Sequence, residues 1–134
     1  MLEHELTVDT SRHRVVDVTD EVQRFVANTG GTGLLNVLLL HATAGVALIE
    51  TGSGSEADLE AALERLLPRD GRYRHSHGSA GHGADHLIPA LVSPSVTLPV
   101  QRGRVRLGTW QRLVIVDLND DNPRRTLHLS LLCG

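Results

Sequence analysis

The N-terminal residues alternate between apolar and acidic or polar side chains, and this period of two predicts a β-strand. One face carries Leu2, His4, Leu6 and Val8, and the other carries Glu3, Glu5, Thr7 and Asp9. Such a strand is half-buried, and residues 15–18 are expected to form its short hairpin partner. The segment Leu34–Leu40 is instead almost uniformly apolar, which predicts a strand buried on both faces near the centre of a sheet.

Two segments have apolar positions at helical spacing. The first helix is expected to begin at Thr19 or Asp20 and to end at Gly30–Gly31, and the second to begin at Ser55 and to stop at Pro68. The apolar positions are Val22, Phe25 and Val26 in the first helix, and Leu59, Ala62, Leu63 and Leu66 in the second. Both helices lie between predicted strands.

The rest of the chain predicts a long polar loop and then mostly strands. The loop covers Arg69–Asp85, and Ala84–Val92 is expected as a short helix or turn. Strands are expected at Ala44–Glu50 before the loop, and at Ser95–Val100, Arg104–Leu107, Leu113–Leu118 and Thr126–Leu132 as a run of hairpins after it. Two main helices among strands predict an α+β fold with mixed or antiparallel sheets. A length of 134 residues is typical of one domain, here residues 1–134.

Composition excludes several classes of function. All 13 basic residues are arginine, so a Schiff-base lysine and a lysine-containing phosphate loop are both absent. The net charge of −3 and three aromatic residues give neither a field nor a stacking platform for nucleic acid. No apolar run approaches the ~20 residues of a membrane-spanning helix, and the acidic N-terminus is unlike a secretory signal. We therefore expect a cytoplasmic protein that binds neither nucleic acid nor membranes.

Histidine is the exception to this plain composition. There are eight histidines, and His75, His77, His82 and His86 fall within twelve residues. Histidines of a loop, joined by His41 at the end of the apolar strand, are a way to build a divalent-metal site with an open position. The alternatives are a hydrogen-bonded core histidine at 41 and a solvated loop that is merely rich in histidine.

Other candidate residues accompany the histidines. Glu50 is a candidate general base or orienting group, and Arg74 adjoins His75, where it would meet an anionic substrate. Trp110 and Gln111 are candidates for contact with a ligand, although a core tryptophan is the equal alternative. The glycine-rich Thr51–Ser55 connection would suit a phosphate, but an ordinary strand-to-helix connection explains it better.

Four ordered motifs give the chain a resemblance to the YjbQ family. His41–Gly45 (HATAG) resembles the HTTAG element of that family, and Pro68–His75 (PRDGRYRH) resembles its PxDGxYxH element. Gly81–His86 is similar to a further segment that ends in Ala-His. Ser93–Pro99, followed by Gly103, Leu107 and Gly108–Gln111 (GTWQ), is similar to the family signature.

The resemblance implies an α+β homotrimer with a metal-binding cluster of histidines at the subunit interface. It implies the activity of a secondary thiamine-phosphate synthase, a transferase that joins a pyrimidine diphosphate to a thiazole phosphate and releases pyrophosphate, as a main or side reaction. By this match His41, His75 and His86 are the metal ligands and Glu50 is the acidic residue. We assign substrate binding to four residues: Thr43, Ser95, Trp110 and Gln111.

The chain departs from the family pattern in three places. The family commonly has a second carboxylate where this chain has Ser53, asparagine where it has His82, and threonine where it has Ala42. The missing carboxylate would weaken or redirect activity, and His82 would supply an extra metal ligand.

The sequence therefore predicts a trimeric divalent-metal enzyme with a small phosphorylated substrate. Zinc is the metal expected, since imidazole ligands suit it, although nickel, cobalt, manganese or iron would also accept them. A metal-dependent hydrolase and a non-enzymatic trimer that binds a metal or small ligand are the alternatives.

Overall fold

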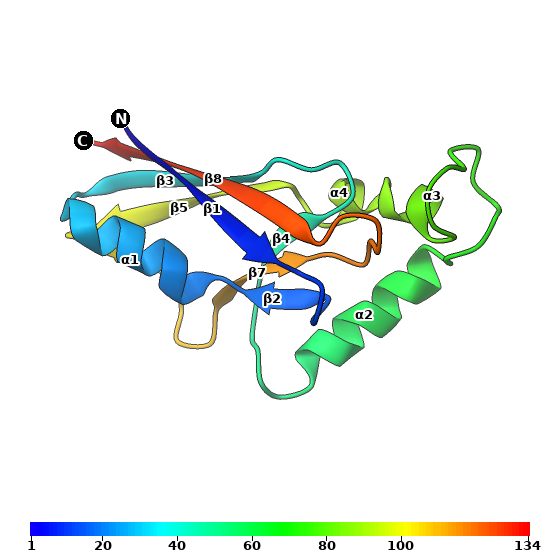
Figure 1. Ribbon diagram of the computed structural model, residues 1–134. Helices are drawn as coiled ribbons and strands as arrows, with labels where there is room; N and C mark the ends of the chain where they lie inside the picture. Colours follow the sequence, from blue (N-terminus) through cyan, green and yellow to red (C-terminus); the bar gives the residue numbers. More distant parts are fainter.

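The computed structural model describes residues 1–134 and contains two antiparallel sheets and four helices (Figure 1). The five-stranded sheet has the order β1-β8-β3-β5-β6, and the three-stranded sheet has the order β2-β7-β4. The strands are β1 (Leu2–Asp9), β2 (Val15–Asp17), β3 (Gly33–Leu39), β4 (Gly45–Ile49), β5 (Ser95–Gln101), β6 (Arg104–Val105), β7 (Arg112–Val116) and β8 (Arg124–Cys133). The helices are α1 (Thr19–Thr29), α2 (Ser55–Leu66), α3 (His82–Asp85) and α4 (Ile88–Leu91). The predicted α+β class is confirmed, and every strand pair is antiparallel.

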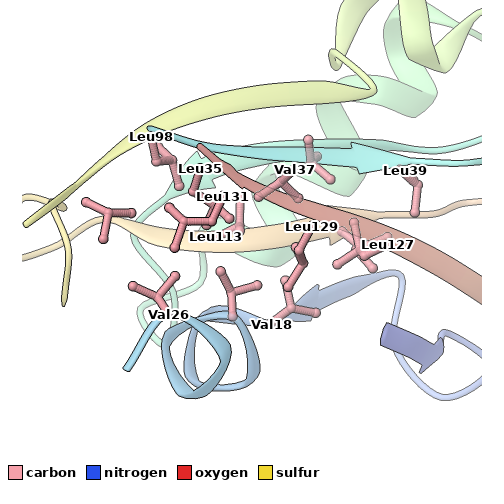
Figure 2. Close-up of a cluster of buried hydrophobic side chains, with 14 of the residues drawn as sticks. Val18, Val26, Leu35, Val37, Leu39, Leu98, Leu113, Leu127, Leu129 and Leu131 are labelled. Carbon is pink, nitrogen blue, oxygen red and sulfur yellow. The ribbon is translucent and has the colours of Figure 1, made fainter. Parts of the chain in front are cut away.

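The main core lies between the five-stranded sheet, the three-stranded sheet and α1 (Figure 2). Alternate residues of neighbouring strands supply it, because successive side chains of a strand point to opposite faces. Its members include Leu35, Val37 and Leu39 of β3, Leu127, Leu129 and Leu131 of β8, and Val22 and Val26 of α1. The same alternation leaves the other face of the five-stranded sheet open.

That open face corrects one expectation about β3. The strand is central, as predicted, since it pairs with both β5 and β8. It is not buried on both faces, however, because Leu34 is 50% exposed, and Leu132 beside it on β8 is 58% exposed. An apolar strand of this kind therefore presents leucine side chains on an outer surface of the chain.

Two pairing expectations are also wrong. The segment Val15–Asp17 pairs with β7 instead of β1, so residues 10–14 carry the chain from one sheet to the other. Of the hairpins expected after residue 95, only β5–β6 forms, since β7 enters the smaller sheet and β8 pairs with β1 and β3. Periodicity predicted the strands but carries no information on which strands pair.

The predicted ends of the two main helices are confirmed to within one or two residues. The N–H of Thr19 donates to Asp17 Oδ1 at 2.9 Å, and Gly30 ends α1 in the left-handed conformation. The helix α2 begins after Gly54 and has no side-chain cap. None of the helices is long and apolar enough to cross a membrane.

A second, smaller core attaches α2 and α4 to the outer side of the three-stranded sheet. It joins Leu63 of α2 and Ile88 of α4 to Val114 and Val116 of β7, together with Val92 and Leu118. Both ends of the histidine-rich connection between α2 and α4 are therefore fixed to the body of the protein. This arrangement places the connection, with the short helix α3, at one end of the molecule (Figure 1).

We predict that Leu129→Ala lowers the free energy of unfolding by about 2–5 kcal/mol, because it opens a cavity in the main core. The matched change Leu66→Ala, at a side chain 66% exposed, is expected to alter it by less than about 0.5 kcal/mol. Urea denaturation followed by circular dichroism measures both. Equal effects of the two substitutions would contradict this account of the core.

Candidate metal centre

Four histidines of the connection between α2 and α4 converge at one point. The ligand nitrogens of His75, His77, His82 and His86 all lie within 4.8 Å of one another. The first two come from the irregular part of the connection before α3, and His82 and His86 lie one helical turn apart at α3. Residues four apart in a helix share a face, so the local fold aims both imidazoles at the same point.

The pair His82 and His86 shows where an ion would sit. Their Nε2 atoms are 2.8 Å apart, a hydrogen-bond distance at which one ring donates and the other accepts. Two nitrogens bound to the same tetrahedral zinc, each about 2.0–2.1 Å from it, are about 3.3 Å apart. A shift of a few tenths of an ångström would therefore convert this contact into shared coordination.

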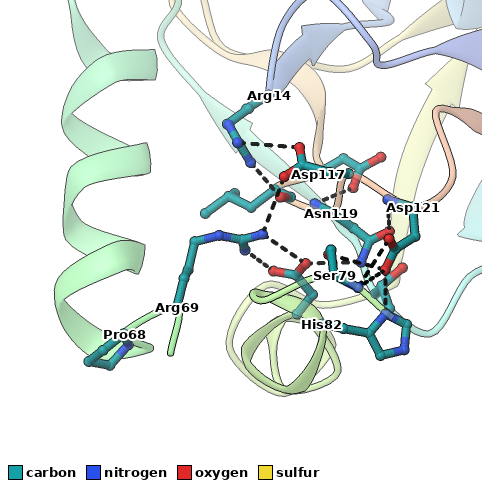
Figure 3. Close-up of polar contacts among 12 residues, drawn as sticks. Arg14, Pro68, Arg69, Ser79, His82, Asp117, Asn119 and Asp121 are labelled. Carbon is teal, nitrogen blue, oxygen red and sulfur yellow. Dashed lines mark hydrogen bonds and ion pairs between the residues drawn. The ribbon is translucent and has the colours of Figure 1, made fainter. Parts of the chain in front are cut away.

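Asp121 fixes the ring orientation of His82. Its carboxylate accepts a hydrogen bond from His82 Nδ1–H at 2.8 Å and further ones from the N–H and hydroxyl of Ser79 (Figure 3). The hydrogen bonds from Ser79 N–H and from His82 hold the pKa of Asp121 below its usual range, so it is ionised and can only accept. The proton of His82 is thus on Nδ1, and its Nε2 lone pair faces the cluster, as in carboxylate–histidine–metal arrangements.

A buried ion pair anchors α3 beneath the cluster. The carboxylate of Asp85 is fully buried and binds the guanidinium of Arg69 through both oxygens, and it also accepts a hydrogen bond from Asn119 Nδ2 at 2.9 Å (Figure 3). A Cβ at position 81 would lie 1.9 Å from Nη2 of Arg69, so a side chain there would displace the guanidinium from its pair with Asp85. The histidine-bearing turn is thereby held close to the body of the protein.

The electrostatics of the cluster favour neutral imidazoles. Partial loss of hydration in the crowded cluster, and after it the charge of neighbouring histidines, holds the pKa values of His75 and His86 below their ordinary value. A histidine must be neutral to bind a metal ion. The cluster is therefore ready to accept a cation at neutral pH.

The structure does not bring His41 to this cluster within one chain. His41 Nε2 accepts a hydrogen bond from the N–H of Thr126 at 2.8 Å, and burial lowers the pKa of His41, with a smaller contribution from Arg125. The neighbouring Thr43 accepts a hydrogen bond from buried Arg125, which pairs with Asp117. Of the three predicted ligands, His75 and His86 are together and His41 belongs to this separate polar network.

The other predicted site residues lie outside the cluster. Glu50 and Arg74 are exposed and form no hydrogen bond or ion pair with it. Ser95 Oγ accepts a hydrogen bond from Asn36 on the open face of the large sheet. Gln111 Oε1 accepts the N–H of Gly108, which closes a tight turn and leaves Trp110 72% exposed. The core alternative for the tryptophan is thus wrong.

Residues that sequence reasoning missed come from the turn after β7. Asn119 and Asp121 lie 34 and 39 residues from their partners Asp85 and His82. The sequence marks this segment only as a turn, so no local pattern could have assigned them. His77 was visible in the histidine-rich stretch, but spacing alone did not single it out as a ligand.

Comparison with known proteins agrees with the motifs. The model of the family described as "UPF0047 protein YjbQ-like" matches residues 4–133. The chain belongs to this family. A UPF0047 protein of Mycobacterium tuberculosis is 62% identical to this YjbQ-family chain over 129 residues, which is 96% of each chain. A UPF0047 protein of Archaeoglobus fulgidus is 32% identical over 128 residues, covering 95% of this chain and 99% of the relative.

Solved structures share the fold of this chain. A hypothetical protein of Aeropyrum pernix has a TM-score of 0.90 with 34% identity, and the two chains cover each other completely. A YbjQ-like protein of unknown function from Sulfolobus solfataricus also has a TM-score of 0.90, over 99% of this chain and 97% of its own length. None of these names states an activity.

We predict that the metal-free protein becomes less stable as the pH falls from 7.5 to 5. The unfolded histidines take up protons near pH 6.5, whereas folded His75 and His86 resist protonation because their pKa values are lowered. Stability is therefore full above about pH 6.5 and declines below it. Urea denaturation in a chelator at several pH values measures this slope, and the His75→Ala/His86→Ala variant should flatten it. An unchanged slope in that variant would contradict the assignment.

Proposed function

We propose that this protein is a divalent-metal-binding enzyme that acts on a phosphorylated substrate, with zinc as its metal. The observation that carries the proposal is the convergence of four imidazole nitrogens within 4.8 Å. Imidazole suits zinc, copper, nickel and cobalt, whereas magnesium prefers oxygen ligands. The donor set contains no carboxylate, so it fits zinc and does not fit magnesium.

The ligands in one chain are proposed to be His75, His82 and His86, with His77 as a fourth. His82 and His86 are held by α3, Asp121 and each other, whereas His77 is exposed and lies on the irregular part of the loop. Three ligands leave an open position for a reacting group, and four close the coordination sphere. His77 therefore decides between a catalytic and a closed site.

The reaction proposed from the family resemblance is that of a secondary thiamine-phosphate synthase. The bond between the pyrimidine methylene carbon and the diphosphate oxygen breaks, the thiazole nitrogen forms a bond to that carbon, and pyrophosphate leaves. A bound divalent ion would supply positive charge to the leaving group. Arg74, next to His75 and free of any carboxylate partner, would bind phosphate, and Glu50 would orient the substrate. Trp110, Gln111, Thr43 and Ser95 are retained as proposed substrate contacts.

A second candidate function follows from the number of ligands. If all four histidines bind the ion, the site has no open position and suits a non-enzymatic trimer that binds the metal for sensing or assembly. If His77 dissociates, a metal-activated water could equally hydrolyse a substrate. The absence of a carboxylate at Ser53 is compatible with either alternative.

We also propose that the chain assembles as a homotrimer, as its family resemblance implies. The open face of the five-stranded sheet supports this, since Leu34 and Leu132 lie side by side there and are 50% and 58% exposed. Burying such leucines favours association. His41 would then reach a metal only from a second copy, because it does not join the cluster of its own chain.

We expect about one divalent ion per chain in the wild type by elemental mass spectrometry of untagged protein. His82→Ala and His86→Ala should each lose at least half of the metal, because each removes a ligand. His13→Ala, at an exposed histidine away from the cluster, is the control and should retain it. Retention in His82→Ala would exclude His82, and loss in His41→Ala would assign the ion to a site shared between copies.

We expect the wild type to release pyrophosphate when a pyrimidine diphosphate and a thiazole phosphate are supplied together. Glu50→Gln should lower the rate about 100-fold or more while metal content is unchanged, because it removes a charged orienting or basic group. Glu64→Gln, an exposed change on α2, is the control. A metal-loaded wild type without turnover would favour the non-enzymatic function.

We expect light scattering to give the wild type about three times the chain mass of 14.5 kDa. The double variant Leu34→Arg/Leu132→Arg should dissociate, since it places charges on the open sheet face. Leu66→Arg, at an exposed leucine of α2, should leave the mass unchanged. A monomeric wild type, or equal dissociation of both variants, would exclude this interface.

A further inference from the structure

The β5–β6 hairpin carries three arginines that have no carboxylate partner. Arg102, Arg104 and Arg106 fall within five residues, and none of them forms an ion pair. Six of the other ten arginines are paired with aspartate or glutamate, namely Arg14, Arg24, Arg69, Arg72, Arg112 and Arg125. A protein with a net charge of −3 thus concentrates unpaired positive charge on one hairpin.

The three side chains line a single shallow cavity of about 420 Å³ that is open to solvent. Val105 and Leu107 pack against the main core, whereas the side chains of Arg104 and Arg106 are exposed. The cavity also includes Gln101, whose Oε1 accepts a hydrogen bond from Arg106 Nη1 at 2.8 Å. That bond orients the guanidinium and leaves its other N–H groups free.

The turn of the hairpin holds an arginine in an unfavourable backbone conformation. Arg102 has a φ of 50°, the left-handed region that glycine and asparagine adopt much more readily. The N–H of Arg102 donates to Thr32 Oγ1 at 2.9 Å, and that of Gly103 donates to the carbonyl of Gly31 at 2.8 Å. These hydrogen bonds fix the turn. Its first central residue is arginine although this residue type is unfavourable in the left-handed conformation.

Helix α1 makes the hairpin rigid from below. Gln23 Nε2 donates to the carbonyl of Gly103 at 2.8 Å, and Gln23 Oε1 accepts the N–H of Val105 at 3.0 Å. Three positive side chains on a rigid support repel one another, and an anion that binds between them removes this repulsion. The support therefore fixes the backbone from which the three arginines project before a ligand arrives.

We propose that Arg102, Arg104 and Arg106 form a binding site for the phosphate or diphosphate group of a small molecule. Guanidinium groups match phosphate oxygens in a two-pronged geometry, and the cavity that the three arginines line is open to solvent, so a phosphate group can reach it. The hairpin lies at the end of the molecule opposite α3 (Figure 1), so the site is separate from the four-histidine cluster of the same chain. The proposal is independent of the metal and of the proposed reaction.

Calorimetric titration with inorganic pyrophosphate, and separately with inorganic phosphate, tests the site. The wild type should bind pyrophosphate with an affinity that falls as salt rises. Arg104→Gln/Arg106→Gln should weaken binding at least tenfold, because two charge-assisted contacts are lost. Arg65→Gln/Arg124→Gln removes two other exposed, unpaired arginines and should change the affinity less than about twofold.

The same titration separates this site from the metal centre. On chelator-treated protein, in which no ion is present at the histidine cluster to bind pyrophosphate, His82→Ala/His86→Ala should bind pyrophosphate as the metal-free wild type does. Loss of binding in that histidine variant, or undiminished binding in the double arginine variant, would overturn the proposal. No binding at millimolar pyrophosphate, or displacement of pyrophosphate by a short RNA at lower concentration, would also overturn it.

Arg102→Gly provides a second test, in which thermal stability and pyrophosphate affinity should change in opposite directions. Glycine accepts the left-handed backbone at position 102 without strain, so the midpoint of thermal unfolding should rise while pyrophosphate affinity falls several-fold. A purely structural role for Arg102 would leave the affinity unchanged. That result would contradict the part assigned to this residue.

Discussion

The fully buried carboxylate of Asp85 is the interaction on which the histidine cluster depends. It lies between the guanidinium of Arg69 and the amide of Asn119, and so joins the end of α2, the helix α3 and the turn after β7. Removal of one partner from a buried ion pair lowers the free energy of unfolding by about 3–5 kcal/mol. The pairing therefore fixes α3 against the body of the protein. This attachment determines where the histidines of α3 lie in the cluster.

The segment that follows β7 connects the core to this attachment. Alternate residues serve different centres: Asp117 binds a buried arginine of the main body, Asn119 binds Asp85, and Asp121 binds His82 (Figure 3). Strand β7 is itself buried between the two hydrophobic cores. A rigid strand thus leads directly into the contacts that orient a metal ligand. The loop that carries the histidines is held by these contacts and not by a hydrophobic core within the loop.

The local sequence pattern was sufficient to locate most helices and strands, and to identify the loop that carries the candidate metal ligands. Periodicity located α1, α2 and the principal strands, and the spacing of histidines identified the loop that contains the cluster. It could not assign Val15–Asp17 to β7, because pairing depends on contacts distant in sequence. It also joined His41 to the loop histidines, although His41 accepts a backbone hydrogen bond from Thr126 instead. The partners of His82 and Asp85 were invisible for the same reason, since each lies more than thirty residues away.

Anomalous diffraction at the zinc absorption edge, from crystals of the zinc-loaded protein, tests the central claim most directly. The account predicts one strong peak per chain, about 2.0–2.1 Å from the Nε2 atoms of His82 and His86 and within coordination distance of His75. The presence or absence of His77 in the coordination sphere would then distinguish the closed site from the open one. A peak at His41 that lacks His82 and His86, or no peak in the cluster, would contradict the account.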